Sequence, residues 1–163
     1  MFVLHTISMS NSTEVASAFR RYAEYLDEKR DQMPRDAYEF ASATWHYDPE
    51  DHRCPHDSWV EQLSVREPSA GERSEVRHID ISVRLLGAYQ DVWIDLVYTD
   101  VKDYSLQLTR ADSSSDIGHG DWLVDELRLS ESGLVIHEVV FSTGARWFIE
   151  CRNICYNAAS RTP

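Results

Sequence analysis

The chain has 163 residues, the length of one ordinary domain, and its 42% hydrophobic content is enough to build a buried core. Sixteen basic against 28 acidic residues give a formal net charge of −12, which disfavours binding to nucleic acid or to an anionic membrane. A protein with a basic surface would instead be attracted to it. A simpler interpretation is that the acidic residues keep the chain soluble and monomeric.

The cysteines and the N-terminal residues bear on the compartment. No apolar run approaches the ~20 residues that a membrane helix needs. The first eight residues lack the basic start and the long apolar stretch of a signal peptide. An odd number of cysteines without such a signal predicts reduced thiols and a cytoplasmic location. These cysteines are Cys54, Cys151 and Cys155.

Residues 11–43 have the pattern of helices. Asn11 and Ser12 are good capping residues before the acidic first turn at Glu14. Pro34 ends this helix, because it disfavours helical geometry in the residue before it, and it can begin a second, short helix. Apolar residues recur at spacings of three and four along the first helix, at Val15, Ala18, Phe19, Tyr22, Tyr25 and Leu26.

Residues 56–156 have the pattern of an antiparallel sheet. Apolar and polar residues alternate, and the segments with this alternation are joined by short turns, which favours antiparallel pairing. We predict loops over 45–55, 66–75 and 111–120. The predicted strands are 59–65, 79–85, 92–98, 104–108, 123–129, 135–141 and 147–151.

Together these elements predict an α+β fold in a single domain, residues 1–163. Two N-terminal helices pack on a curved antiparallel β-sheet, which is either a meander or a partly closed barrel.

Histidine, cysteine and carboxylate side chains are crowded between His46 and Asp57. These are the ligands that zinc prefers, and a closed structural site needs four of them. None of the recognised metal-binding spacings occurs here, so our first expectation is a polar loop without a metal. The alternative is a metal site formed by His52, Cys54, His56 and Asp57.

Two further His–Asp steps could support catalysis. A histidine beside an aspartate can act as a general base, with the carboxylate fixing the tautomer of the ring. No nucleophile motif and no glycine-rich phosphate loop accompanies them, so we expect no cofactor. The alternative catalytic set is His56, Asp57, His119 and Asp121.

His137 and Asp125 share the parity of the apolar residues in their strands. A lone histidine on an apolar face is usually a hydrogen-bonded core residue. A buried carboxyl without a partner would have a raised pKa, which marks either a functional or a hydrogen-bonded structural group. We predict that the two side chains pair across neighbouring strands.

Aromatic residues support a binding role, because such side chains are common anchors at interfaces. The candidates for a binding surface are Trp59, Tyr89, Trp93, Asp121 and Trp122.

Five short segments carry a resemblance to a known group of proteins. They are His56-Asp-Ser-Trp-Val60, Leu85-Leu-Gly-Ala-Tyr89, Val97-Tyr-Thr-Asp-Val101, Gly120-Asp-Trp-Leu-Val-Asp-Glu126 and Ile136-His-Glu-Val-Val-Phe141. The pattern resembles small uncharacterised bacterial proteins and is similar to immunity-type proteins of bacterial toxin systems. The resemblance covers roughly residues 55–156 and implies a protein that acts by binding and has no catalytic residues.

The function predicted from the sequence is therefore a non-enzymatic protein-binding module, immunity-like, whose acidic surface meets a basic protein partner. The alternative is a metal-assisted hydrolase that uses the His/Asp cluster.

Overall fold

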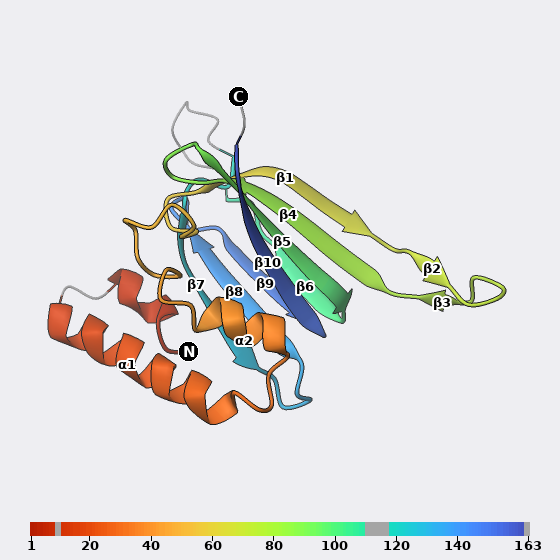
Figure 1. Ribbon diagram of the computed structural model, residues 1–163, viewed down its shortest axis with the longest axis horizontal. Coiled ribbons are helices and arrows are strands. Elements are labelled where there is room, and N and C mark those ends of the chain that lie inside the picture. Colours follow the sequence, from red (N-terminus) through yellow and green to blue (C-terminus); the bar gives the residue numbers. More distant parts are fainter. Residues whose placement is uncertain (9–10, 110–117, 162–163) are drawn as a thin grey trace.

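The computed structural model describes residues 1–8, 11–109 and 118–161. Within them a short 3-10 helix and two α-helices precede ten strands, which form two four-stranded antiparallel sheets and a two-stranded arm (Figure 1). The predicted α+β class and antiparallel pairing are confirmed. The elements are η1 (Leu4–Ser8), α1 (Ser12–Lys29), α2 (Arg35–Ala41), β1 (Trp59–Arg66), β2 (Ser69–Ala70), β3 (Val76–Arg77), β4 (Ile79–Leu86), β5 (Val92–Val101), β6 (Asp103–Leu106), β7 (Trp122–Leu129), β8 (Val135–Phe141), β9 (Arg146–Cys151) and β10 (Asn153–Ser160).

One sheet has the strand order β1-β4-β5-β10 and the other has the order β6-β9-β8-β7. Two pairs of strands pass from one sheet into the other, where β5 runs into β6 through Lys102 and β9 runs into β10 through Arg152. The carboxylate of Asp100 holds this corner, because it accepts hydrogen bonds from Lys102 Nζ at 2.6 Å and from Arg152 Nε at 3.0 Å. These bonds lower the pKa of Asp100.

A second corner joins the start of β1 to the start of β7. Trp59 and Asp121 form a bridge, Trp122 N–H donates to the Ser58 carbonyl at 2.8 Å, and Asp57 N–H donates to the Trp122 carbonyl at 2.9 Å. The single curved sheet that we expected is therefore two sheets that meet at two corners. The strand order of each remains open, so neither is closed into a barrel.

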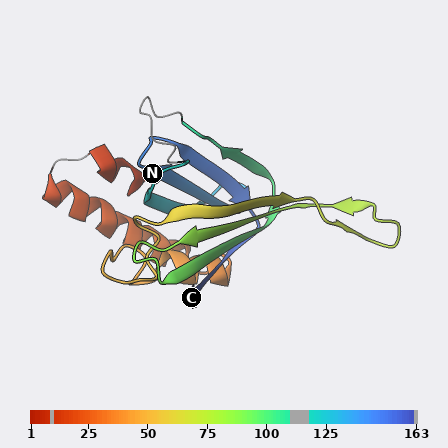
Figure 2. The same ribbon diagram turned by 90° about the horizontal axis from the view of Figure 1, so that it is seen from above.

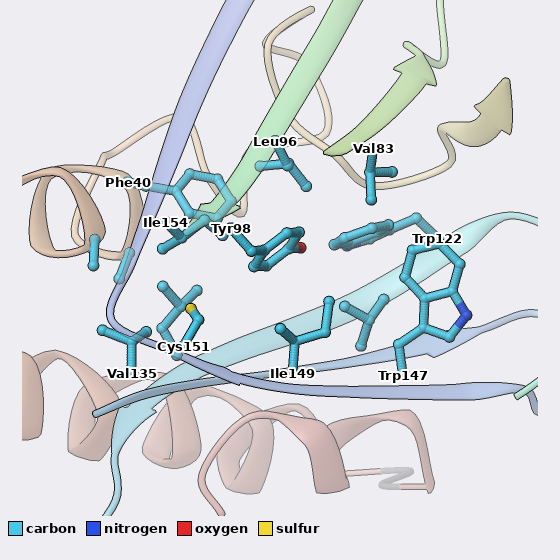
Figure 3. Close-up of a cluster of buried hydrophobic side chains, with 14 of the residues drawn as sticks. Phe40, Val83, Leu96, Tyr98, Trp122, Val135, Trp147, Ile149, Cys151 and Ile154 are labelled. Atoms are coloured by element: carbon cyan, nitrogen blue, oxygen red, sulfur yellow. The ribbon is translucent and has the colours of Figure 1, made fainter. Parts of the chain in front are cut away.

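The main core lies between the two sheets. Figure 3 shows Tyr98 and Leu96 of β5 facing Ile149 and Trp147 of β9 across this space. All four side chains are at most 1% exposed. Residues from the helices and from both sheets belong to one buried cluster.

The helices lie on one side of the molecule, next to β7 and β10 (Figure 1). We expected them to cover a sheet face, but α1 meets the edge of β7 through tyrosine hydroxyls. Tyr22 Oη donates to the Leu127 carbonyl at 2.9 Å and accepts from the Leu127 N–H at 2.8 Å. Tyr25 Oη accepts from the Leu129 N–H at 2.8 Å. The hydroxyls thus take the place of a neighbouring strand along β7.

The N-terminal residues are attached to β7 by a buried carboxylate. Glu126 is fully buried, and its Oε2 accepts hydrogen bonds from the backbone N–H groups of Phe2 at 2.6 Å and Val3 at 2.7 Å. Val3 and Leu4 are buried beside it. Free N–H groups at the start of η1 therefore receive a negatively charged partner.

The sequence prediction is wrong in two strand regions. Residues 66–75 are not only a loop, because β2 lies within them and pairs with β3 to lengthen the β1–β4 hairpin into an arm that projects from the body (Figure 2). Strand β10 was missed, since only Ile154 in it is fully buried and its alternation is weak. Most of the predicted loop 111–120 lies outside the described residues.

No helix among the described residues is long and apolar enough to cross a membrane.

The hydrogen bonds of Tyr22 and Tyr25 to β7 should contribute unequally to the stability of the fold. Tyr22→Phe leaves both backbone groups of Leu127 without partners in a buried place, so we expect the free energy of unfolding to fall by about 1–3 kcal/mol. Tyr25→Phe removes one partly buried bond and should cost less, about 0.5–1.5 kcal/mol. Urea unfolding of both variants measures the difference. Equal losses in the two variants would contradict the edge-capping role of Tyr22.

Candidate functional site

The most unusual polar group of the described chain is the buried carboxylate of Asp125 on β7. Two histidines donate to it, since His46 Nε2 and His137 Nε2 each lie 2.9 Å from its Oδ2. Trp122 Nε1 donates to the other oxygen, Oδ1, at 2.9 Å. Asp125 and the two histidines are at most 2% exposed. The predicted pairing of His137 with Asp125 is confirmed, and we call these four residues the Asp125 centre.

The outer nitrogens of both histidines also have partners. His46 Nδ1 lies 2.9 Å from the Phe40 carbonyl, which can only accept, so this nitrogen carries a proton. The Tyr98 hydroxyl lies 2.9 Å from His137 Nδ1 and can donate to it. With Asp125 ionised, both Nε2 atoms also carry protons. These partners give His46 a proton on both ring nitrogens, whereas the Tyr98 hydroxyl can either donate to His137 Nδ1 or accept from it.

Burial raises the pKa of Asp125, but the charges of His46 and His137 and their hydrogen bonds to the carboxylate outweigh burial and hold that pKa well below its usual range. Burial also raises the pKa of Tyr22, Tyr47 and Tyr98 well above the ordinary value. These hydroxyls therefore stay protonated and serve as hydrogen-bond donors.

The Asp125 centre connects distant parts of the chain. Its members come from β7, from β8 and from the segment between α2 and β1, and its outer partners come from α2 and β5. Tyr47 adds a hydrogen bond from its hydroxyl to the Asp125 carbonyl at 2.8 Å. Every ring nitrogen and both carboxylate oxygens are already occupied, so the centre is built to hold the fold together rather than to exchange protons with a substrate.

A pocket of about 360 Å³ lies against this centre, between η1, α1 and β7. Its lining is mainly apolar and aromatic and includes Val15, Phe19 and Tyr47. His56 also lines it and is fixed by a 2.7 Å hydrogen bond between its Nδ1 and the Leu123 carbonyl.

The predicted catalytic set does not gather in one pocket. His56 Nε2 lies 3.5 Å from Asp57 Oδ1, beside the pocket just described. His119 and Asp121 line a different pocket, of about 280 Å³, together with Trp59. Burial lowers the pKa of His119, whose ring packs on aromatic side chains rather than on a carboxylate.

The predicted metal ligands also have separate partners. His52 Nδ1 lies 2.7 Å from Asp91 Oδ2, and its ring stacks on Tyr89. Cys54 is buried, its thiol donates to the His46 carbonyl at 3.0 Å, and burial raises its pKa to about 11. Across residues 1–8, 11–109 and 118–161, no three His, Cys, Asp or Glu side chains are grouped to hold a metal ion.

The candidates for a binding surface have mixed outcomes. Tyr89 is 51% exposed and Asp121 is exposed. Trp93 is half-buried between the guanidinium groups of Arg84 and Arg161. Trp59 is half-buried as well.

The prediction for Trp122 has to be corrected. This residue is fully buried, and its indole N–H is used by Asp125, so the prediction that it lies on a surface is wrong. The alternation that we followed through this strand is interrupted by a bulge between Trp122 and Val124, which turns the indole into the core.

Sequence reasoning missed two members of the hydrogen-bond network, His46 and Tyr98. His46 was grouped with the polar loop around it, although it follows Trp45 and precedes Tyr47, and this aromatic setting was a signal of burial. Tyr98 has the parity of the inward-facing residues of its strand, which indicated a buried hydroxyl that needs a partner.

Comparison of the chain with protein-family models, with curated proteins and with solved structures found no match.

Removing the carboxylate from the Asp125 centre should be strongly destabilising. In Asp125→Asn the amide cannot accept all the hydrogen bonds that the carboxylate accepts, and the charged His46 loses its counter-ion. We expect a loss of about 3–5 kcal/mol in the free energy of unfolding. His52→Gln breaks the exposed pair with Asp91 and should cost less than about 1 kcal/mol. Urea unfolding compares them, and a similar small loss in both would refute the role of Asp125.

The lowered pKa of Asp125 predicts how the free energy of unfolding changes at acidic pH. A carboxyl whose pKa is lower in the folded than in the unfolded chain contributes stability above its unfolded value, about 3.9, and this contribution is lost as the pH falls below it. Wild type should therefore lose more unfolding free energy between about pH 5 and pH 3 than Asp125→Asn. Other carboxylates titrate in both proteins, so the difference between the two curves reports on Asp125 together with the two histidines bonded to it. Parallel curves would contradict the prediction.

Proposed function

We propose that the chain is a non-enzymatic protein-binding module, immunity-like, whose acidic surface meets a basic protein partner. The observation that carries the proposal is an exposed tyrosine set among carboxylates. Tyr89 is 51% exposed, and its hydroxyl donates to the Pro49 carbonyl at 3.1 Å. Asp48 and Glu50 flank Pro49, and Asp91 follows Tyr89 by two residues. These three carboxylates and Tyr89 form what we call the acidic surface.

The acidic surface is held in shape by its own contacts. The rings of His52 and Tyr89 stack with their centroids 4.1 Å apart and their planes 8° apart. The hydrogen bond between His52 and Asp91 ties the 42–58 segment to the 87–91 turn. A rigid aromatic ring of this kind loses little conformational freedom on binding, which favours a role as an anchor.

The charge around Tyr89 supports a basic partner. Residues 42–58 and 87–91 contain five acidic residues, namely Asp48, Glu50, Asp51, Asp57 and Asp91, and one basic residue, Arg53. Arg161 also donates to the Gln90 carbonyl at 3.3 Å, so five minus two gives an excess of three negative charges, with histidines counted as neutral. Such a surface attracts basic proteins and repels other acidic ones.

A binding role agrees better with the described side chains than hydrolysis does. The Asp125 centre has no free acceptor for a substrate proton, and the two expected His–Asp steps line different pockets. A general base must reach the proton that it removes within hydrogen-bond distance. We therefore advance no second function.

The experiment is affinity capture of partner proteins from a lysate of the cell that encodes the chain, at about 0.05 M and about 0.5 M salt, across which the Debye length falls severalfold. We expect a basic protein that is captured at low salt and at least about tenfold less at high salt. The triple variant Asp48→Asn, Glu50→Gln, Asp91→Asn should lose this capture.

The matched control removes three negative charges elsewhere, with Glu24→Gln, Asp31→Asn and Glu131→Gln, all exposed. The control has the same net charge as the first triple variant and should still capture the protein. Capture that is independent of salt, or that is lost equally in both triple variants, would refute the proposal.

A further inference from the structure

The two sheets have four edge strands, and three of them are protected within the described residues. The β7 edge is capped by tyrosine hydroxyls, as described above. Helix α2 packs along β10, where Asp36 accepts hydrogen bonds from Asn153 Nδ2 and Cys155 Sγ. β6 has only four residues. Capping, coverage and shortness are the usual ways in which proteins block an edge.

Among the described residues, the fourth edge, β1, is neither capped, covered nor short, although a bulge interrupts its pairing with β4 between Val60 and Gln62. It is eight residues long, and only its first residue, Trp59, pairs on the outer side, with Asp121. Beyond that bridge, β1 leads toward the β2–β3 arm, which projects from the body (Figure 2). Val65 is 44% exposed.

The register shows which backbone groups of β1 face outward. Successive residues of a strand inside a sheet turn their backbone N–H and C=O groups alternately to one neighbour and to the other. Gly87 N–H donates to the Val92 carbonyl at 3.0 Å, so Gly87 and every second residue before it in β4 bond to β5. The remaining residues of β4 bond to β1, and one of them, Ser82, pairs with Ser64. The residues on either side of Ser64 therefore turn their N–H and C=O groups to the free side.

These outward residues are Leu63 and Val65. Among the described residues, neither has a hydrogen bond to another segment on that side. Each therefore offers one donor and one acceptor to an incoming strand.

The charges near this edge are mainly acidic. Glu61 and Arg66 lie on β1 and Glu67 follows it, and all three are exposed. A second copy paired antiparallel, with Leu63 opposite Val65, would place Glu61 opposite Glu67, and like charges directly opposite are destabilising. Lysine or arginine at the same positions of an incoming strand would be favourable. Asp57 and Asp121 add negative charge at the start of the strand.

We propose that the free edge of β1 binds an extended segment of a basic protein as an added antiparallel strand. This inference rests on the proposed function, since it names the way in which the basic partner is held. Backbone hydrogen bonds to Leu63 and Val65 supply the affinity, and the carboxylates supply the preference for basic side chains.

The first experiment uses two synthetic peptides of nine residues, one alternating lysine and valine and the other alternating glutamate and valine. Amide resonances of the full chain are followed by NMR during titration. The lysine peptide should shift the Leu63 and Val65 amides most and slow their hydrogen exchange. The glutamate peptide should bind at least about tenfold more weakly, because it repels Glu61 and Glu67. Equal binding of both peptides, or shifts confined to Tyr89 and its neighbours, would overturn the inference.

A proline variant tests the backbone contact directly. Val65→Pro removes an N–H that faces outward, and proline is tolerated on an edge strand. It should weaken binding of the lysine peptide by about fivefold to tenfold, through loss of one hydrogen bond. Val65→Thr keeps the N–H and the branched shape and should bind like wild type. If Val65→Pro does not fold, the hydrogen-exchange protection of the wild-type Leu63 and Val65 amides decides the question instead.

Two outcomes separate this inference from the proposed function. If Val65→Pro still captures the basic protein as wild type does, the edge is not its binding site, although the proposed function stands. If no salt-sensitive capture occurs, the proposed function fails, whereas the peptide titration still reports on the edge. Sedimentation of the chain alone adds one test, since a dimer that Val65→Pro dissociates would show that a second copy occupies β1 and would overturn the inference.

Discussion

The Asp125 carboxylate is buried, ionised and hydrogen-bonded by three side chains, and the rest of the fold has to satisfy it. Moving a charge out of water is costly unless the charge is paired and its hydrogen bonds are complete. Here the segment between α2 and β1 must bring His46 into the core, and β8 must bring His137 to the same oxygen. One residue thereby determines the relative placement of a loop and two strands, while the neighbouring hydroxyl of Tyr98 links the centre to the other sheet.

A second constraint is the edge of β7, whose backbone N–H and C=O groups need hydrogen-bond partners although, in the part of the chain that the structure describes, no strand lies beside them. Hydroxyls of Tyr22 and Tyr25 on α1 reach the backbone of Leu127 and Leu129, so the helix is bound along an edge instead of across a face. Among the described residues, the helix that packs on the β1-β4-β5-β10 sheet is α2, and it lies against the edge strand β10. The Trp93 ring on that sheet is covered by the guanidinium groups of Arg84 and Arg161.

These constraints place some polar groups in the core and leave others at the surface. His137 and Asp125, which the sequence predicted as a pair, are used in the core. At the surface of the described residues lie the exposed ring of Tyr89, with its carboxylates, and the outward backbone groups of Leu63 and Val65 on β1. The start of β1 follows directly on the acidic 42–58 segment.

Local pattern determined a large part of this protein. Alternation predicted β4, β5, β7, β8 and β9 within a few residues, since half-buried strands repeat every second residue. Shared parity predicted the contact between His137 and Asp125, because both side chains had to enter the same core. The excess of acidic over basic residues was likewise evident from the composition alone.

Tertiary structure decided the rest, because the deciding contacts join residues far apart in the chain. His46 reaches Asp125 across 79 positions and Tyr22 reaches Leu127 across 105, and no local spacing encodes such contacts. The division into two sheets depends on bends at Lys102 and Arg152, and Asp100, two residues before the first bend, reaches Arg152 at the second across 52 positions. The bulge beside Trp122 shifted its strand's parity and moved the indole from the expected surface into the core. Periodicity specifies which residues avoid water, whereas only packing specifies which partner each buried polar group finds.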